Sequence, residues 1–285
     1  MYRFSLAEGF EPSPTRRAVG ITLVVLAMGA AAFAVGCGHK STTDTTTASL
    51  PTSTKATPTG PAVPVTPPGP TPPTVSHYKL AVTAWRGGDR DGAVTEFRAA
   101  IAEDSTKLPP RLNLSRVLIE QGKAKDAIDE IQQVIAIDST SGSAYRLLGR
   151  AHDFLGQTDS AVADYQHAIV LNNQDGWSIN NLGLVQIERG EYDEALKTLS
   201  RAVELSNSAT FRNSLGVALE KTGHYTAAVE AYKSALSADS GYTRAQTNLT
   251  RVTSLTEAPG TPAVDLAAQA LEFMKEVDSW KTPKN

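Results

Sequence analysis

The stretch LGRAHDFLGQTDSAVADYQHA, from Leu148 to Ala168, is followed 34 residues later by LGLVQIERGEYDEALKTLSRA, from Leu182 to Ala202. Both stretches begin with a leucine–glycine pair, carry a second glycine eight residues after the leucine, and end on an alanine. Self-similarity at a fixed period of roughly 20 to 50 residues is typical of repeat proteins, in which each unit is one supersecondary motif. We therefore expect this chain to stack such units.

The same features recur outward in both directions along the chain. The glycines are separated by 34, 34, 34 and 33 residues, and alanines and leucines follow in the same register. The glycines are Gly88, Gly122, Gly156, Gly190 and Gly223; the alanines are Ala93, Ala127, Ala161, Ala195 and Ala228; the leucines are Leu80, Leu114, Leu148, Leu182, Leu215 and Leu249. These series predict repeats at residues 74–107, 108–141, 142–175, 176–208 and 209–242, with a partial repeat at 243–257.

Each repeat is predicted to form two antiparallel helices. Gly149 lies on the first helix, where a small residue lets the partner helix approach, and Gly156 permits the turn. The second helix carries an inner stripe of small, large and small residues, which suits close helix packing. The stripes are Ala93, Phe97 and Ala100; Ala127, Ile131 and Val134; Ala161, Tyr165 and Ala168; Ala195, Leu199 and Ala202; and Ala228, Tyr232 and Ala235.

The 34-residue period and the Leu-Gly, Gly, Ala-x3-aromatic and Ala positions resemble the tetratricopeptide repeat, over about residues 74–255. This resemblance implies an all-α fold, a right-handed α-solenoid over residues 77–257 with five clear repeats and a degenerate sixth. It also implies protein binding without catalysis. The family's closing proline is replaced by residues that we expect to cap the following helix. These residues are Ser105, Ser139, Asn173, Asn207 and Ser240.

A last helix is predicted over residues 262–280, after the break Ala258-Pro259-Gly260-Thr261-Pro262. Its expected inner stripe is Ala267, Leu271, Met274 and Val277. Terminal repeats of a solenoid need a polar cover, so we expect this helix to cap the stack. The alternative is a helix that docks on a partner or folds into the protein's own groove.

The N-terminus has the features of a secretory signal over residues 1–36. Arg16 and Arg17 precede an apolar run that ends at Gly36 and Cys37. The sequence Ala34-Val35-Gly36-Cys37 resembles the lipobox of bacterial lipoproteins, with Ala34 where the family prefers leucine. The resemblance implies that Cys37, the one cysteine of the chain, receives a lipid and becomes the mature N-terminus. Two alternatives remain. The apolar run approaches the roughly 20 residues that span a bilayer, so it could be an uncleaved anchor, or the signal could be cleaved without attachment of a lipid.

The signal also predicts a location in the cell envelope. The twin arginines resemble the Tat signal, but the residues after them lack its aromatic and leucine positions, so the Sec route is favoured. Gly38 follows the cysteine where an aspartate would indicate retention at the inner membrane. A lipid anchor in the outer membrane, facing the periplasm, is therefore expected.

Residues 37–76 combine the lipid-attachment cysteine with a segment rich in threonine, proline and serine. No apolar period is present, so this segment is predicted to be disordered. It is either a spacer that holds the repeats away from the membrane or a linker of no required length.

No pattern in the chain predicts chemistry. The formal net charge of −3 gives no basic surface for nucleic acid. The five histidines lack zinc-ligand spacing, and no nucleophile elbow, P-loop or dinucleotide fingerprint is present. We expect no enzymatic activity, no metal, no cofactor, no nucleic-acid partner and no small-molecule substrate.

The resemblance implies that the first helices line a concave groove. Arginine and amide side chains there suit a peptide backbone or a carboxylate. Arg146, Arg150 and Asn181 faintly resemble the family's carboxylate clamp, although Arg replaces the usual Lys and Asn and the last part is missing. Ordinary solvated residues are the alternative. The groove residues are Arg116, Arg146, Arg150, Asn180, Asn181, Asn213, Arg244, Asn248 and Arg251.

Three functions are compatible with these features. The first is a lipoprotein scaffold that helps to assemble an envelope complex of the pilus or secretion type, similar to pilotin-like factors. The second is a regulatory or adaptor subunit of a cell-wall enzyme or envelope protease. The third, a hydrolase built from scattered residues, has no motif behind it. The first is the hypothesis that the sequence favours.

Overall fold

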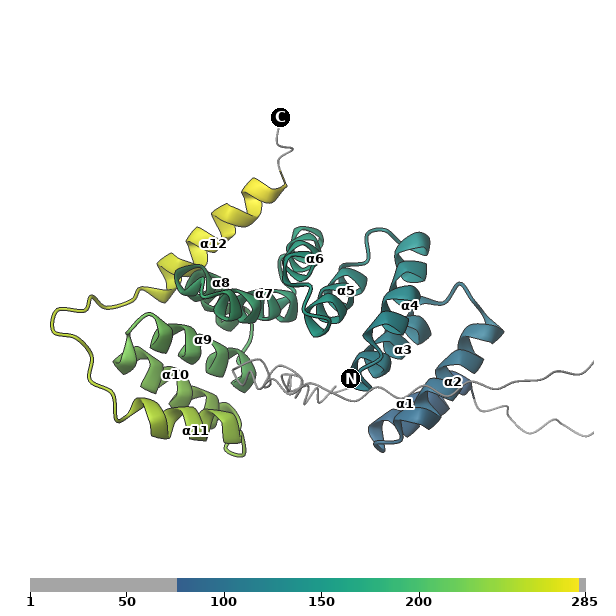
Figure 1. Cartoon of the computed structure of the whole chain (residues 1–285), viewed down its shortest axis with the longest axis horizontal. Coiled ribbons are helices and arrows are strands. Elements are labelled where there is room, and N and C mark those ends of the chain that lie inside the picture. Colours follow the sequence, from purple (N-terminus) through teal and green to yellow (C-terminus); the bar gives the residue numbers. More distant parts are fainter. Residues whose placement is uncertain (1–75, 282–285) are drawn as a thin grey trace, which may run out of the picture. The chain divides into compact units, whose positions relative to one another are not determined.

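The computed structural model describes residues 76–281, so the signal segment, Cys37 and most of the tether lie outside the described residues. Residues 76–281 form twelve α-helices and no strand (Figure 1). The helices are α1 (His77–Arg86), α2 (Arg90–Glu103), α3 (Leu108–Glu120), α4 (Ala124–Ile137), α5 (Gly142–Phe154), α6 (Thr158–Leu171), α7 (Gly176–Arg189), α8 (Tyr192–Leu205), α9 (Ala209–Lys221), α10 (Tyr225–Ala238), α11 (Thr243–Val252) and α12 (Leu266–Trp280).

The helices form a stack of hairpins. The first and second helices of each repeat pack together, from α1 with α2 to α9 with α10, and each second helix packs on the first helix of the next repeat. The first ten helices are joined by short turns, and successive repeats keep the same helix bounds in register. Contacts between neighbouring units define a solenoid, so the predicted all-α solenoid is confirmed.

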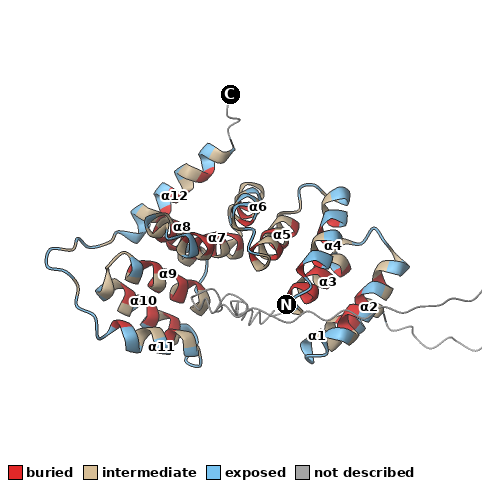
Figure 2. Ribbon diagram, viewed as in Figure 1, coloured by how far each residue is buried: buried red, intermediate tan, exposed pale blue. Residues whose placement is uncertain are grey.

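The core of each hairpin is the stripe predicted on its second helix. Ala161, Tyr165 and Ala168 are 1% exposed or less, and the stripes of the other four second helices are buried in the same way (Figure 2). In the third, fourth and fifth repeats the first helix meets this stripe with a glycine. A Cβ atom on Gly183 would lie 2.5 Å from Leu199 Cγ, so only a residue without a side chain lets α7 and α8 approach this closely.

The turn inside each hairpin also depends on glycine. Gly190 ends α7 with φ of 78°, a left-handed conformation that glycine adopts without steric cost. The amides of Gly190 and Glu191 donate to the carbonyls of Ile187 (3.1 Å) and Gln186 (2.9 Å), which is the Schellman pattern. Positive φ angles occur at all five glycines of the predicted series.

The prediction that a serine or asparagine caps each following helix is wrong. The N-cap residues lie further along, at Lys107, Ser141, Asp175, Ser208 and Tyr242. At four of the five turns between repeats, the residue before the predicted cap organises the turn instead. Asp138 ends α4 in an extended conformation, and its Oδ1 accepts hydrogen bonds from the backbone amide (2.9 Å) and hydroxyl (2.7 Å) of Thr140. An Asx turn therefore replaces the family's proline.

Helix α12 differs from its prediction in both start and face. It begins at Leu266, because the Asp265 side chain accepts from the amides of Ala267 and Ala268, both at 3.0 Å. The expected inner face is wrong at Ala267, which is exposed, and at Leu271, which is 58% exposed. The buried face is Ala270, Phe273 and Val277, each 2% exposed or less.

Helix α12 packs on the second helices of the fourth and third repeats, mainly α8 and also α6. Helix α8 is adapted for a neighbour at this face. Ser200 is 4% exposed, whereas the equivalent Arg98 and Lys233 of the first and fifth repeats are exposed. A long charged side chain at Ser200 would obstruct such packing.

The last repeat has its polar cover in α11. Ala245 and Val252 are buried, while Gln246, Thr247 and Thr250 are exposed, which matches the polar outer face that a terminal solenoid helix requires. Within residues 76–281, no helix combines the length and the apolar character that crossing a membrane requires.

Candidate functional site

The predicted groove residues lie on the first helices of the repeats. We call the surface formed by α3, α5, α7, α9 and α11 the first-helix face, because each of these helices contacts the next one along the chain. Arg116 lies on α3, Arg146 and Arg150 on α5, Asn180 and Asn181 on α7, Asn213 on α9, and Arg244, Asn248 and Arg251 on α11.

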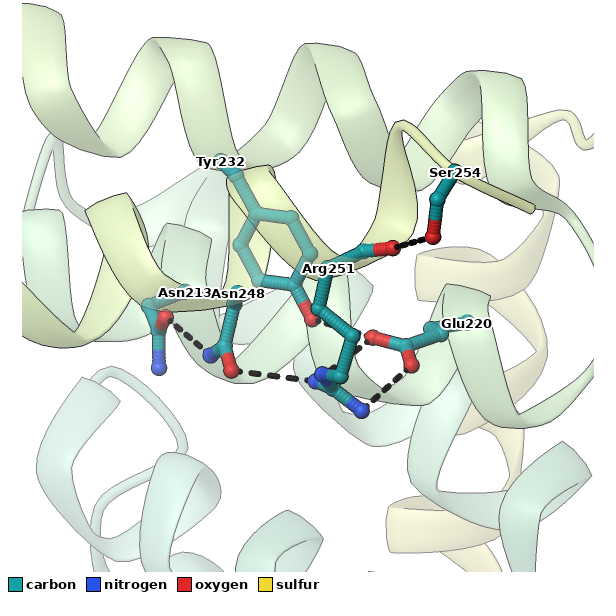
Figure 3. A network of polar contacts seen from close by, with 6 residues as sticks. All are labelled: Asn213, Glu220, Tyr232, Asn248, Arg251 and Ser254. Atoms are coloured by element: carbon teal, nitrogen blue, oxygen red, sulfur yellow. Dashed lines mark hydrogen bonds and ion pairs between the residues drawn. The ribbon is translucent and has the colours of Figure 1, made fainter.

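One set of contacts on this side of the stack joins residues that are 35 positions apart. Asn248 Nδ2 donates to Asn213 Oδ1 at 2.9 Å (Figure 3). At the other end of the stack, Asn113 Nδ2 donates to the Tyr78 hydroxyl at 3.0 Å. These bonds link the fifth residue of one repeat to the sixth residue of the next. Part of the predicted amide set therefore serves to hold neighbouring repeats together.

A second set joins residues 31 positions apart and involves arginine. Arg251 Nη1 lies 2.6 Å from Glu220 Oε1, whose side chain is 8% exposed. The equivalent pair near the N-terminal end places the Arg116 guanidinium 5.6 Å from the centroid of the Trp85 ring, a cation–π distance. Both arginines are thus engaged within the chain.

Glu220 is the centre of a network that joins three helices (Figure 3). The Tyr232 hydroxyl, on α10, donates to Glu220 Oε2 at 3.1 Å. Arg251 Nη2 donates to Glu220 Oε2 at 2.9 Å and to Asn248 Oδ1 at 3.0 Å. Burial and, secondly, the negative charge of Glu220 raise the pKa of Tyr232, so its hydroxyl remains a neutral donor.

Arg146 is also engaged, by a residue that the sequence did not indicate. Its Nε lies 3.1 Å from Asp175 Oδ2. Asp175 caps α7, since it accepts from the Trp177 amide (3.2 Å) and the Ser178 hydroxyl (2.6 Å). Of the three clamp-like residues, Arg146 therefore neutralises a helix cap, and Arg150, like Arg244, interacts with neighbouring groups of the chain.

Helix α7 carries two amide oxygens that are buried without a hydrogen bond. Asn180 is 1% exposed, and its Oδ1 is buried without a hydrogen bond. The sixth residue of the next repeat, Ser214, donates instead to the Thr210 carbonyl at 3.0 Å. Gln186 Oε1, further along α7, is also buried and unbonded. A buried polar group without a partner costs about 1–3 kcal/mol, so these acceptors require an explanation.

Carboxylates of the chain neutralise part of the positive charge of the first-helix face. Glu220 and Asp175 pair with two of its arginines, and Asp153 on α5 is buried.

Among residues 76–281, no three histidine, cysteine or acidic side chains converge as a metal site. Elsewhere, His152 Nδ1 lies 2.6 Å from Asp164 Oδ2, and burial raises the pKa of Asp164 against the opposing effect of His152.

The sequence analysis missed four residues that bind polar side chains on this side of the stack: Tyr78, Trp85, Asp175 and Glu220. Three of them recur in the repeat register, at the fifth or twelfth residue of a repeat. The signal that could have found these three is the sequence separation of 35 or 31 residues, which relates a position in one repeat to a nearby position in the next.

Three models of the tetratricopeptide repeat match the chain, at residues 84–151, 142–175 and 180–243. Among curated proteins, no sequence matches this chain.

Solved structures share the architecture at low sequence identity. A thermophilic TPR protein of Thermus thermophilus, TTC0263, is 21% identical, with a TM-score of 0.56 over 63% of this chain and 98% of its own. The APC/C hetero-tetramer Cut9–Hcn1 contains a chain that is 19% identical, with a TM-score of 0.59 over 71% of this chain. This chain spans 40% of the length of that one. At these identities the likeness concerns the fold alone.

Proposed function

Because the chain is built from tetratricopeptide repeats, we propose that it is a non-enzymatic scaffold that binds an extended segment of a partner protein along the first-helix face. One observation carries this proposal: Asn180 is almost fully buried in α7, and its Oδ1 has no hydrogen bond. An extended peptide presents a row of backbone donors and acceptors, and a rotation of the Asn180 amide toward the surface would let this oxygen accept one N–H from it. Asn181, half-buried beside it, adds a second amide.

The ion pairs that this face already contains support a contact with a peptide backbone over a carboxylate clamp. Arg146 and Arg251 already have carboxylate partners, and an additional carboxylate would have to compete with Asp175 or Glu220. An amide pays no such cost, because it is both donor and acceptor. The proposed contact is therefore centred on α7.

Replacing Asn180 by leucine is expected to change stability and binding in opposite directions. Removal of an unsatisfied buried amide should raise the free energy of unfolding by about 1 kcal/mol, while the affinity for the partner should fall on the order of tenfold. Urea unfolding measures the first effect. Measuring the affinity requires the partner, which a photo-crosslinking residue placed at Asn181 would identify. The same residue at exposed Gln133 on α4 is the control for this crosslinking.

Asn213→Leu is the matched control, because the same change there breaks the bond to Asn248 and should lower stability. If Asn180→Leu destabilised the protein as much as Asn213→Leu, the proposed role of Asn180 would be refuted. Equal crosslinking at positions 181 and 133 would contradict the location of the site. Capture of a cell-wall enzyme or an envelope protease would favour the regulatory or adaptor function.

We further propose that a lipid on Cys37 holds this scaffold at the cell envelope, at the outer membrane facing the periplasm. There it would assist assembly of a complex of the pilus or secretion type. The support is the sequence alone: the apolar run, the Ala34–Cys37 segment and the absence of an aspartate at position 38.

Cys37→Ser is expected to abolish incorporation of labelled fatty acid and to move the protein from the membrane fraction to the soluble fraction. The reason is that serine offers no thiol for the lipid, and a cleaved chain then has no anchor. Ser41→Ala is the control and should change neither result. A Cys37→Ser chain that stays in the membrane fraction would indicate an uncleaved apolar anchor.

A further inference from the structure

The first two repeats share a contact between a basic side chain and a glutamate that joins their two helices and that the fifth repeat lacks. In the first repeat, His77 Nδ1 lies 2.6 Å from Glu96 Oε2. In the second, Arg111 Nη1 lies 2.6 Å from Glu130 Oε2. Both pairs join the fourth residue of the repeat, on the first helix, to the residue 19 positions later, on the second helix. The Arg111 and Glu130 side chains are 14% and 25% exposed, so the pair is partly buried in the hairpin.

In the fifth repeat the cation is present and the acid is absent. Arg212 is the fourth residue of that repeat, and the residue 19 positions later is Ala231. Helices α9 and α10 have the same lengths and the same intervening turn as α3 and α4. Ala231 therefore occupies the place of Glu130, and its methyl group ends well short of where the Glu130 carboxylate lies.

The Arg212 guanidinium is left without a counter-charge. Nη1 is buried and makes no hydrogen bond, and no acidic side chain within residues 76–281 forms an ion pair with Arg212. A guanidinium withdrawn from water without a partner is unfavourable, whereas a carboxylate beside it forms a strong charge-assisted bond. Arg212 and Ala231 are each partly exposed, so a ligand can reach this part of the hairpin from solvent although Nη1 itself is covered.

We propose that Arg212 and the space beside Ala231 form a receptor for an aspartate or glutamate side chain of a bound polypeptide. That carboxylate would take the place that Glu130 holds in the second repeat. A carboxylate is the chemistry that the chain itself uses twice at this position. The site lies between the two helices of the fifth repeat and does not include Asn180 or Asn181, so it extends beyond the scaffold function proposed above.

The first test supplies the acid within the chain. In the full-length protein, Ala231→Glu should raise Tm on the order of 3 °C, because it rebuilds the ion pair of the second repeat. The gain should vanish in an Arg212→Gln background, and Ala136→Glu, at an exposed position on α4, should give none. A gain that persists without Arg212, or no gain in the wild-type background, would overturn the assignment.

The second test supplies the acid from solution. Sodium glutarate, titrated into full-length protein, should shift the NMR signal of the Arg212 guanidinium saturably, and the apparent affinity should fall on the order of tenfold in Ala231→Glu. Asn180→Leu should leave the response unchanged, which separates this site from the first-helix face. No response to glutarate, an unchanged response in Ala231→Glu, or a response to sodium phosphate alone would each refute a carboxylate receptor.

Discussion

Gly183→Val is expected to lower the free energy of unfolding by about 3 kcal/mol, at the upper end of the range for overpacked cores. A Cβ atom on Gly183 would lie 2.5 Å from Leu199 Cγ and 2.6 Å from its Cδ2. Leu199 is fully buried, so it has no solvent-exposed position to which it could move. The helices α7 and α8 would have to separate. Urea unfolding of the wild-type and variant chains, monitored by circular dichroism, measures the difference.

The same substitution in a Leu199→Ala background provides the control. Leu199→Ala alone should destabilise the protein by about 3 kcal/mol through the cavity that it leaves. The valine methyl groups would fill part of that cavity, so the two effects should be clearly less than additive. Additive effects would show that contact with Leu199 is not what excludes a side chain at position 183.

The sequence predicts the features of the fold that every repeat forms in the same way. Tyr165 is buried as expected because its neighbours Ala161 and Ala168 are on the same helix, and helical periodicity alone puts them together. Leu80 belongs to the leucine series but is 40% exposed. The reason is its place at the start of the stack, where no preceding repeat covers it. The periodicity of a sequence carries no information about such an end.

The site is predicted less well, because its contacts depend on which partner each polar group finds. The sequence predicts that Arg146 and Asn180 lie on first helices, and they do, but Asn180 is 1% exposed and is therefore not the exposed groove position that the sequence predicts. It does not indicate that Asp175 neutralises Arg146 or that Ser214 donates to Thr210 and leaves Asn180 unpaired. Hydroxyl and amide groups have several possible partners within reach, and only the packed structure selects one of them.

Helix α12 shows the same limit for apolar residues. Its sequence contains two candidate apolar stripes, one through Ala267 and Leu271 and one through Ala270 and Phe273. Helical periodicity permits either. The choice depends on α8, which is far away in sequence and presents a small residue, Ser200, on its covered surface. The second stripe is the one that packs.

Phe273→Ala is expected to weaken the docking of α12 by about 3 kcal/mol, as for other truncations of a buried aromatic ring. Phe273 is fully buried in a cluster with Tyr165, Ile169 and Phe211, and it meets the Trp280 ring at 5.8 Å between centroids. Helix α12 contacts α8 and α6 from outside the stack, so its loss need not unfold the repeats. Hydrogen exchange at residues 266–280 should therefore increase far more than exchange in α7 and α8.

Leu271→Ala is the matched control, because it removes an apolar side chain from the same helix at a position that is 58% exposed. Its effect on stability should stay within about 0.5 kcal/mol, as for most surface substitutions. If Leu271→Ala released α12 as effectively as Phe273→Ala, the stripe through Leu271 would be the docking face. If neither variant changed exchange at residues 266–280, contact with α8 would not be what holds α12. A loss of protection in Phe273→Ala but not in Leu271→Ala would show that α12 packs on α8 through Ala270, Phe273 and Val277.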